Sequence, residues 1–196
     1  MITRNPISNL ASKVASILSY SSLKRRIGNQ PVLDAERELN PTLSGYPRNH
    51  DYTVRSKTLV PGFKLHERFR LVSELCKPGL ESFLDVGSCR GFYAMSAAQM
   101  PGCKRALGVD IDEPFISLSS QVRDHLELKN CEFKLAGINE IAEEPERFGA
   151  PFTTVLNVGT YHYLYWGSER CSTALYDHRE ILSRFAKICT KRLIFS

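Results

Sequence analysis

Two glycines and a carboxylate in the segment 84–93 have the types and the spacing of a cofactor-binding loop. Asp85 lies in a short apolar run, Gly87 ends that run, and Gly91 directly precedes a helical pattern. Glycine permits a sharp turn where a side chain would clash, and the start of a helix presents backbone N–H groups that have no partner within the helix. We therefore expect a ligand to bind between this strand and this helix.

A second carboxylate, Asp110, ends the next apolar run, nineteen residues after Gly91. A carboxylate at this position can accept hydrogen bonds from two neighbouring ribose hydroxyls. The glycine pair alone is weak evidence, because it also fits a tight turn without a ligand. Together with an acid at this distance, the pair predicts a cofactor that contains a nucleoside.

The composition of the loop favours one class of cofactor over another. Loops that bind a pyrophosphate usually carry three glycines in the pattern G-x-G-x-x-G, whereas Gly87 and Gly91 have three other residues between them. The carboxylate of Asp85, two residues before the turn, repels a pyrophosphate and suits a cationic ligand. These features favour S-adenosylmethionine, which carries an ammonium and a sulfonium, over NAD. An NAD-binding oxidoreductase is the alternative.

Two stretches resemble motifs of the class I S-adenosylmethionine-dependent methyltransferases, residues 84–91 the first motif and residues 106–111 the second. The resemblance covers residues 65–196 and implies a Rossmann-like fold, S-adenosylmethionine as cofactor and an enzyme of the EC 2.1.1 class. It implies methyl transfer to a small molecule or to a nucleoside, including a nucleoside in RNA. A truncated or non-catalytic relative that acts as a binding protein is a further alternative.

The resemblance also assigns roles to individual residues. The glycine loop would contact the methionine part of the cofactor, with Asp85 near it. Asp110 would bind the ribose, and Ile111 would pack against the adenine. The cofactor-binding residues predicted in this way are Asp85, Gly87, Ser88, Cys89, Gly91, Asp110, Ile111, Ile138 and Asn157.

Two positions depart from the family's pattern. Cys89 stands where the first motif usually has its middle glycine. The segment 135–139 has no acid, although the family often places one there against the adenine amino group. Asn139 or a backbone carbonyl would replace that acid, or packing alone would hold the adenine.

The segment 155–167 combines the end of a strand, a turn at Gly159 and a dense run of aromatic residues with one histidine. By the resemblance, Asn157 would lie beside the cofactor and the following residues would face the acceptor. His162 is the candidate catalytic base for an acceptor that must lose a proton, because the pKa of a free imidazole is near neutral. The alternative for His162 is a structural hydrogen bond to the backbone. The aromatic residues would either pack beneath a loop or stack on a planar or cationic acceptor.

Strands and helices must alternate along the chain to position these residues. Apolar runs predict strands at 82–87, 105–111, 132–135, 152–158 and 192–195, and helical spacing predicts helices at 65–75, 92–100, 114–128 and 175–188. Such alternation is typical of a parallel sheet that helices cover on both faces. We therefore expect a doubly wound, mostly parallel Rossmann-like α/β fold.

The strand predicted at 192–195 is the fifth, whereas the resembled fold has seven strands and ends in an antiparallel hairpin. By this count the chain lacks the last two strands. A strand at an exposed edge is a liability that proteins normally cover. We expect a homodimer through this strand, cover from the N-terminal helix, or a truncated chain.

Positive charge is concentrated at the start of the 196-residue chain. The formal net charge is +5, and residues 1–30 contain five basic and no acidic residues. We predict a basic N-terminal helix and irregular arm at residues 1–61 and the Rossmann-like domain at residues 62–196. The basic helix would pack on its own domain, touch a membrane surface or a partner, or serve as an organelle transit peptide.

The six cysteines include no C-x-x-C pair, which argues against a zinc site or a thioredoxin-type motif. No apolar run approaches the ~18 residues of a membrane span, and no apolar segment of a secretory signal follows the N-terminus. We therefore expect reduced thiols, no metal and a cytoplasmic location, with organelle targeting left open.

Overall fold

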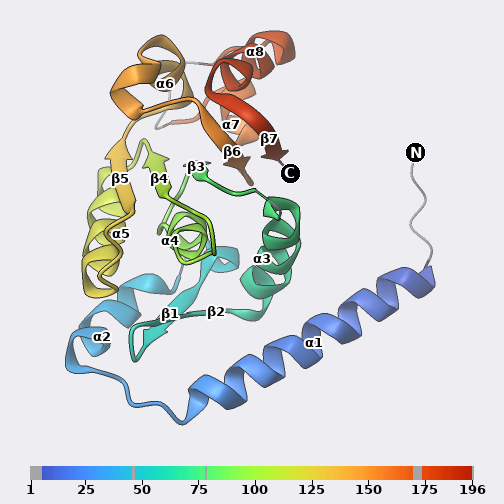
Figure 1. Ribbon diagram of the computed structural model, residues 1–196, viewed down its shortest axis with the longest axis vertical. Helices are drawn as coiled ribbons and strands as arrows, with labels where there is room; N and C mark the ends of the chain where they lie inside the picture. The colour runs from blue at the N-terminus through green and yellow to red at the C-terminus, as the bar shows by residue number, and fades with distance from the viewer. Residues whose placement is uncertain (1–5, 46, 78, 170–173, 196) are drawn as a thin grey trace. The chain divides into compact units, whose positions relative to one another are not determined.

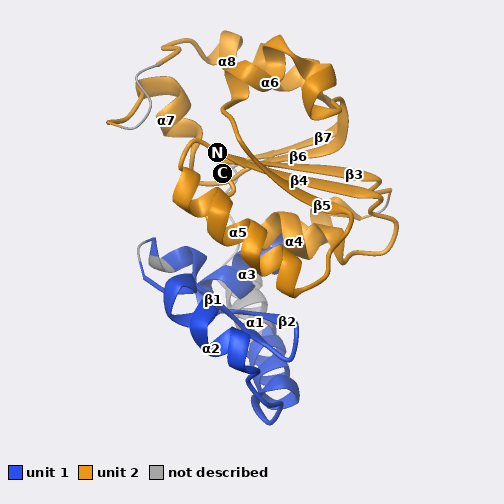
Figure 2. Ribbon diagram, turned by 90° about the vertical axis from the view of Figure 1, so that its left-hand side faces the viewer, with its two compact units in different colours: residues 1–71 blue, residues 72–196 orange. Residues whose placement is uncertain are grey.

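The chain divides into two compact units, residues 1–71 (unit 1) and residues 72–196 (unit 2), which Figure 2 colours separately. The computed structural model describes every residue except 1–5, 46, 78, 170–173 and 196.

Unit 1 consists of helices and one β-hairpin (Figure 1). Its elements are α1 (Pro6–Gly28), α2 (Asp34–Leu39), the 3₁₀ helices η1 (Asn40–Leu43) and η2 (Arg48–His50), the strands β1 (Tyr52–Arg55) and β2 (Thr58–Pro61), and the first part of α3 (Phe63–Cys76). The segment 31–61, which we expected to be irregular, thus carries five short elements.

A buried carboxylate stabilises the turn of this hairpin. Ser56 and Lys57 have φ angles of 46° and 56°, and such left-handed conformations at both positions are what a two-residue hairpin turn requires. The fully buried Glu36 accepts hydrogen bonds from the backbone N–H groups of Ser56 (3.0 Å) and Lys57 (2.8 Å). It accepts a third from the backbone of Leu33 at 2.9 Å. Neither turn residue is a glycine or an asparagine, so the hairpin depends on a contact between distant parts of the sequence.

Unit 2 contains a five-stranded sheet in the order β5-β4-β3-β6-β7, and every neighbouring pair is parallel. The strands are β3 (Ser82–Val86), β4 (Arg105–Asp110), β5 (Cys131–Leu135), β6 (Phe152–Asn157) and β7 (Cys189–Phe195). The connecting helices are α4 (Phe92–Ala98), α5 (Glu113–His125), α6 (Ile138–Glu143), η3 (Pro145–Phe148), α7 (Tyr161–Trp166) and α8 (His178–Ile188).

Helices cover both faces of this sheet, with α4 and α5 on one face and α6 and α8 on the other (Figure 2). The central strands are therefore buried on both sides, and Leu84, Leu107 and Val155 are fully buried. Phe185 and Ile181 of α8 pack in the same core. The doubly wound, Rossmann-like α/β prediction is confirmed, and the described sheet has fewer strands than the seven of the resembled fold.

The direction in which strands are added reverses at β3. The chain builds β4 and β5 on one side of β3 and then returns to place β6 and β7 on the other side. In open α/β sheets, ligands bind beyond the carboxyl ends of the strands at such a reversal. Asp85 and Asn157 lie at the carboxyl ends of the two strands that meet there, β3 and β6.

β7 is the outermost strand on one side, and among the described residues its outer edge has no strand neighbour. The expected homodimer through this strand stays a prediction.

Candidate functional site

The two loop glycines adopt conformations and positions that other residues fit poorly. Gly87 and Gly91 have φ angles of 76° and 74°. A Cβ atom on Gly87 would lie 2.4 Å from Thr160 Cγ2, and one on Gly91 would lie 2.5 Å from Phe133 Cζ. The turn therefore brings the loop after β3 against the loop after β6 and against β5.

Cys89, which replaces the family's middle glycine, also has a positive φ of 50°. Its thiol is buried, and this burial raises the pKa of the thiol to about 12. The thiol therefore stays protonated at neutral pH. The backbone of Cys89 is bonded on both sides, because its N–H donates to Asp110 at 2.8 Å and its carbonyl accepts from Ser119 Oγ at 3.2 Å.

Asp110 holds this loop in place through both carboxylate oxygens. Its Oδ2 accepts a hydrogen bond from the backbone N–H of Cys89 at 2.8 Å, and its Oδ1 accepts one from Asp112 at 3.0 Å. Burial raises the pKa of Asp110 above its ordinary value, and the hydrogen bonds from Cys89 and Asp112 act against that rise. A carboxylate has about four lone-pair sites, so Asp110 can still accept hydrogen bonds from a ribose.

Asp85 differs from Asp110 in its surroundings. Only 2% of Asp85 is exposed, and its Oδ2 has no hydrogen-bond partner among the described residues. Burial and then the charge of Asp110 raise the pKa of Asp85 to about 8, while a hydrogen bond from the backbone of Ala94 lowers it. A cation placed against Oδ2 would favour the charged carboxylate and supply the missing partner.

Two further buried oxygens near the loop lack partners within the described residues, Ser88 Oγ and Asn157 Oδ1. Buried polar atoms are almost always hydrogen-bonded, so three unpartnered oxygens at one end of the sheet indicate a place for a ligand. Together with Asp85, they suit a ligand that ends in a cationic amino-acid group. The residues present therefore fit the predicted cofactor.

Asn157 also connects β6 to β3. Its Nδ2 donates to Thr160 Oγ1 at 2.6 Å and to the carbonyl of Val86 at 3.3 Å. Thr160 Oγ1 donates to the same carbonyl at 3.3 Å. Asn157 thus ties the end of β6 to the end of β3 and anchors the start of α7 there, and its position beside the cofactor stays a prediction.

The residues predicted to lie near the adenine differ in how far the structure exposes them. Ile111 is 43% exposed next to the end of β4, whereas Ile138 is buried in the core of unit 2. Asn139, which follows it, has a buried Oδ1 without a described partner. This oxygen can accept a hydrogen bond from an adenine amino group, one of the three options for this segment.

α7 presents His162 at the surface, where its ring lies 3.9 Å from the ring of Tyr163. The same short helix contributes to an aromatic cluster with the start of α8. The members of this α7–α8 cluster are Tyr161, Tyr165, Trp166, Tyr176 and His178.

His178, the first residue of α8, holds the cluster together. Its Nδ1 makes a 2.9 Å hydrogen bond with the hydroxyl of Tyr161, and its ring stacks on Tyr165 at 4.4 Å. Trp166 and Tyr176 are 67% and 62% exposed. Tyr161 and Tyr165, in contrast, are half-buried and pack against the core of unit 2. The run is thus divided between packing and exposure, and stacking on an acceptor stays a prediction.

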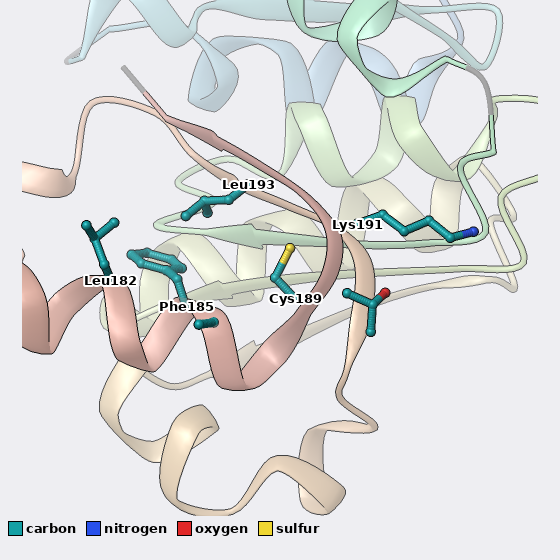
Figure 3. A pocket seen from close by; sticks show the side chains of 7 residues that line it. Leu182, Phe185, Cys189, Lys191 and Leu193 are labelled. Atoms are coloured by element: carbon teal, nitrogen blue, oxygen red, sulfur yellow. The ribbon is translucent and has the colours of Figure 1, made fainter.

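A depression between α8 and β7 lies on the outer strand rather than at the glycine loop (Figure 3). Its lining is mainly apolar and includes Leu182, Phe185, Cys189 and Leu193. None of the predicted site residues contributes to it.

No group of three or more His, Cys, Asp or Glu side chains suited to a metal ion occurs in the described part of the chain. Five of the cysteines are free thiols there, and Cys171 lies outside the described residues.

Comparison with known proteins bears on this arrangement. A family model described as "Methyltransferase domain" matches residues 79–185, more than half of the chain. The tRNA (guanine-N(7)-)-methyltransferase of Synechocystis sp. is 34% identical over 73 residues, which are 37% of this chain and 33% of that protein. The chain thus spans about a third of the length of this curated relative.

Solved structures share the fold at low sequence identity. WbdD in complex with a kinase inhibitor aligns with a TM-score of 0.50 at 20% identity, over 65% of this chain and 29% of that chain. Precorrin 8W decarboxylase of Methanobacterium thermoautotrophicum aligns with a TM-score of 0.50 at 18% identity, over 66% of this chain and 61% of that chain. At these identities the likeness shows the fold alone.

Proposed function

The chain belongs to the class I S-adenosylmethionine-dependent methyltransferase family, and from that premise we propose that it transfers the methyl group of S-adenosylmethionine to an acceptor bound beside α7. S-adenosylmethionine is the cofactor of this family. The observation that carries the proposal is the set of unpartnered buried oxygens of Asp85, Ser88 and Asn157 around the glycine loop.

The residues of the site would divide the binding of the cofactor among them. Asp85 would face the cationic amino-acid end, and Asp110 would accept hydrogen bonds from the ribose while it keeps its own bonds to the loop. Ile111 would pack against the adenine, and Asn139 would accept a hydrogen bond from the adenine amino group.

When bound, the cofactor supplies a methyl group on a positively charged sulfur, open to in-line attack. For such a displacement a protein contributes mainly proximity and alignment. The contact of Thr160 with Gly87 and the bonds of Asn157 would align the two sides of the site. His162 would accept the proton of an acceptor that must lose one, because its neutral imidazole carries a free lone pair.

The acceptor is proposed to be a small molecule or a nucleoside with a planar group. The exposed rings of Trp166 and Tyr176 in the α7–α8 cluster support this, because aromatic side chains stack on planar groups. The matching stretch in a tRNA (guanine-N(7)-)-methyltransferase supports a nucleoside.

Transfer from cofactor labelled with tritium in its methyl group tests the proposal. The full chain is incubated with this cofactor and either bulk RNA or a small-molecule extract. We expect label in one acceptor fraction, and a loss of about 10²-fold or more in rate for His162→Ala if the acceptor must lose a proton. Unlabelled fractions from a protein that still binds S-adenosylmethionine would contradict methyl transfer and favour a non-catalytic binding protein.

A further inference from the structure

The two units differ in charge far more than the whole chain suggests. Unit 1 contains twelve Lys and Arg residues against five Asp and Glu, a formal charge of +7, whereas unit 2 contains fourteen against sixteen, a charge of −2. A domain with a strong positive excess is suited to polyanionic partners.

The acidic residues of unit 1 do little to offset this excess at its N-terminal end. No acidic residue precedes Asp34 in the sequence. Glu36 is fully buried and accepts the backbone hydrogen bonds of the hairpin. Asp34 is exposed beside Arg37, 3.7 Å away on the same short helix. The positive charge of α1 therefore has no local counter-charge on its own helix.

Contacts within unit 1 hold the last turns of α1 against α3. The ring of Tyr20 lies 5.3 Å from Phe63 and 5.4 Å from His66. Ile27 is buried, and Arg55 Nη1 donates a 2.6 Å hydrogen bond to the carbonyl of Gly28. The C-terminal half of α1 is thus fixed in place within unit 1.

Basic residues occur on both of these helices. Lys24 lies one turn after Tyr20, with its Nζ 5.3 Å from the tyrosine ring. Arg25 and Arg26 follow it and are exposed, as is Lys64 on α3. Arg68 lies one turn further along α3. The basic surface defined in this way consists of Lys24, Arg25, Arg26, Lys64 and Arg68, none of which forms an ion pair within the described residues.

We propose that this basic surface binds the phosphate backbone of RNA. If the chain transfers a methyl group as proposed above, RNA binding by this surface implies that the acceptor is a nucleoside within an RNA chain rather than a free small molecule. This inference therefore rests on the proposed function. When Lys and Arg side chains that are not paired within the protein bind phosphates, they displace the counterions condensed on the RNA. The release of these counterions favours association. The hydroxyls of Ser21 and Ser22, exposed on the same helix, suit hydrogen bonds to phosphate oxygens.

The apolar residues in the second half of α1 agree less well with a membrane surface. A helix that lies on a membrane needs a continuous apolar face. Within residues 17–28 of α1, Ile27 is buried and Leu23 half-buried, which leaves Ile17 and Leu18 as the exposed aliphatic residues of that half. No helix in the described part of the chain is long and apolar enough to cross a membrane.

Binding of the full chain to fluorescently labelled, unfractionated tRNA tests the proposal, measured by anisotropy over a series of salt concentrations without cofactor. The test variant is the triple substitution Lys24→Gln, Arg25→Gln, Arg26→Gln. The matched control neutralises three exposed basic residues of unit 2: Lys129→Gln, Arg179→Gln, Lys187→Gln. A second variant, Lys64→Gln with Arg68→Gln, leaves α1 unchanged.

We expect the wild type to bind tRNA with a steep salt dependence. The triple variant should bind about tenfold or more weakly, with the slope of log K against log salt reduced by about 2 to 3, and the unit 2 control should equal the wild type. The α3 variant should weaken binding less, with the slope reduced by about 1 to 2. Circular dichroism verifies that each variant folds.

Three results would overturn the proposal: no binding to tRNA, equal binding by the triple variant and the wild type, or binding to vesicles of phosphatidylserine and phosphatidylcholine without binding to tRNA. Calorimetry with S-adenosylmethionine on the same preparations separates this proposal from the proposed function. If the protein binds tRNA but not the cofactor, the proposed methyl transfer is contradicted and the RNA-binding surface is not. If it binds the cofactor but not tRNA, the RNA-binding surface is contradicted and the proposed methyl transfer is not.

Discussion

Asp85 and Asp110 lie at the carboxyl ends of neighbouring strands, and their surroundings give them different tasks. Asp110 already orders the loop, because both of its oxygens accept backbone hydrogen bonds. Asp85 is buried with an oxygen that has no described partner and with a raised pKa. One carboxylate therefore shapes the site, and the other is a destabilising feature of the free protein that a cationic ligand would relieve.

The raised pKa of Asp85 predicts a specific dependence of stability on pH. The pKa is about 8 in the folded protein and about 4 in an unfolded chain. Between these values the unfolded chain releases a proton that the folded protein keeps, so the stability of the free protein falls as the pH rises. Asp85→Asn cannot ionise and should lose this dependence, becoming more stable than the wild type by a margin that grows from about pH 4 to about pH 8.

Urea unfolding of both proteins at about pH 5 and about pH 8 measures this margin. The same variant should bind S-adenosylmethionine more weakly than the wild type does. An identical pH dependence in the two proteins would show that Asp85 does not retain its proton in the folded state.

Gly87 is predicted to tolerate no side chain. Gly87→Ala adds a Cβ that would lie 2.4 Å from Thr160 Cγ2, in a left-handed conformation, and should destabilise the protein by about 2 to 4 kcal/mol. Gly159→Ala is the matched control, because Gly159 has a φ of 75° with open space around its Cβ position, and it should cost only about 1 kcal/mol. Urea denaturation measures the free energy of unfolding of each variant and of the wild type. Adding Thr160→Ala to Gly87→Ala should recover part of the loss, and equal losses for the two glycine variants would refute the steric argument.

At the scale of elements, the strands of unit 2 were predictable and several shorter elements were not. Parallel strands buried on both faces occur as continuous apolar runs, and glycines such as Gly87 mark their ends. The sequence could predict the positions of Asp85, Gly87 and Asp110 because they lie at the ends of two consecutive strands, close together in the sequence. α7, only six residues long, shows no helical spacing of apolar residues in its aromatic run.

What sequence patterns missed depends on contacts between distant residues. The hydrogen bond between Tyr161 and His178 joins residues on either side of the segment between α7 and α8. That segment has no helical or strand spacing of apolar residues, so no sequence pattern indicates the bond. The burial of Ile138 in the core likewise follows from how α6 packs on the sheet. The hairpin of unit 1 depends on Glu36, twenty residues before the turn it stabilises.

The hairpin provides a prediction at this scale. Glu36→Gln replaces the carboxylate that accepts three backbone hydrogen bonds, each of which a charged acceptor strengthens. We expect a loss of about 1.5 to 3 kcal/mol in the stability of unit 1, with faster amide hydrogen exchange across β1 and β2. Glu38→Gln, on the exposed side of the same helix, should change neither quantity. Unaltered exchange in Glu36→Gln would mean that the turn forms without this carboxylate.

At the scale of the whole molecule, a basic unit and a slightly acidic unit are joined in one chain. The net charge of +5 arises from unit 1 rather than from the methyltransferase domain. The division of labour that we propose follows from this asymmetry: unit 2 binds the cofactor and carries the chemistry, and unit 1 binds the polyanionic partner.

The central claim is that the glycine loop and Asp110 bind an adenosyl cofactor, and calorimetric titration of the full chain tests it most directly. S-adenosylmethionine and S-adenosylhomocysteine should each bind at one site, and NADH should not bind. Asp110→Ala should weaken binding by about tenfold or more, because a charged hydrogen-bond partner is lost, whereas Asp124→Ala, an exposed aspartate of α5, should leave it unchanged. Binding of NADH alone, or equal affinity in Asp110→Ala and the wild type, would contradict the account.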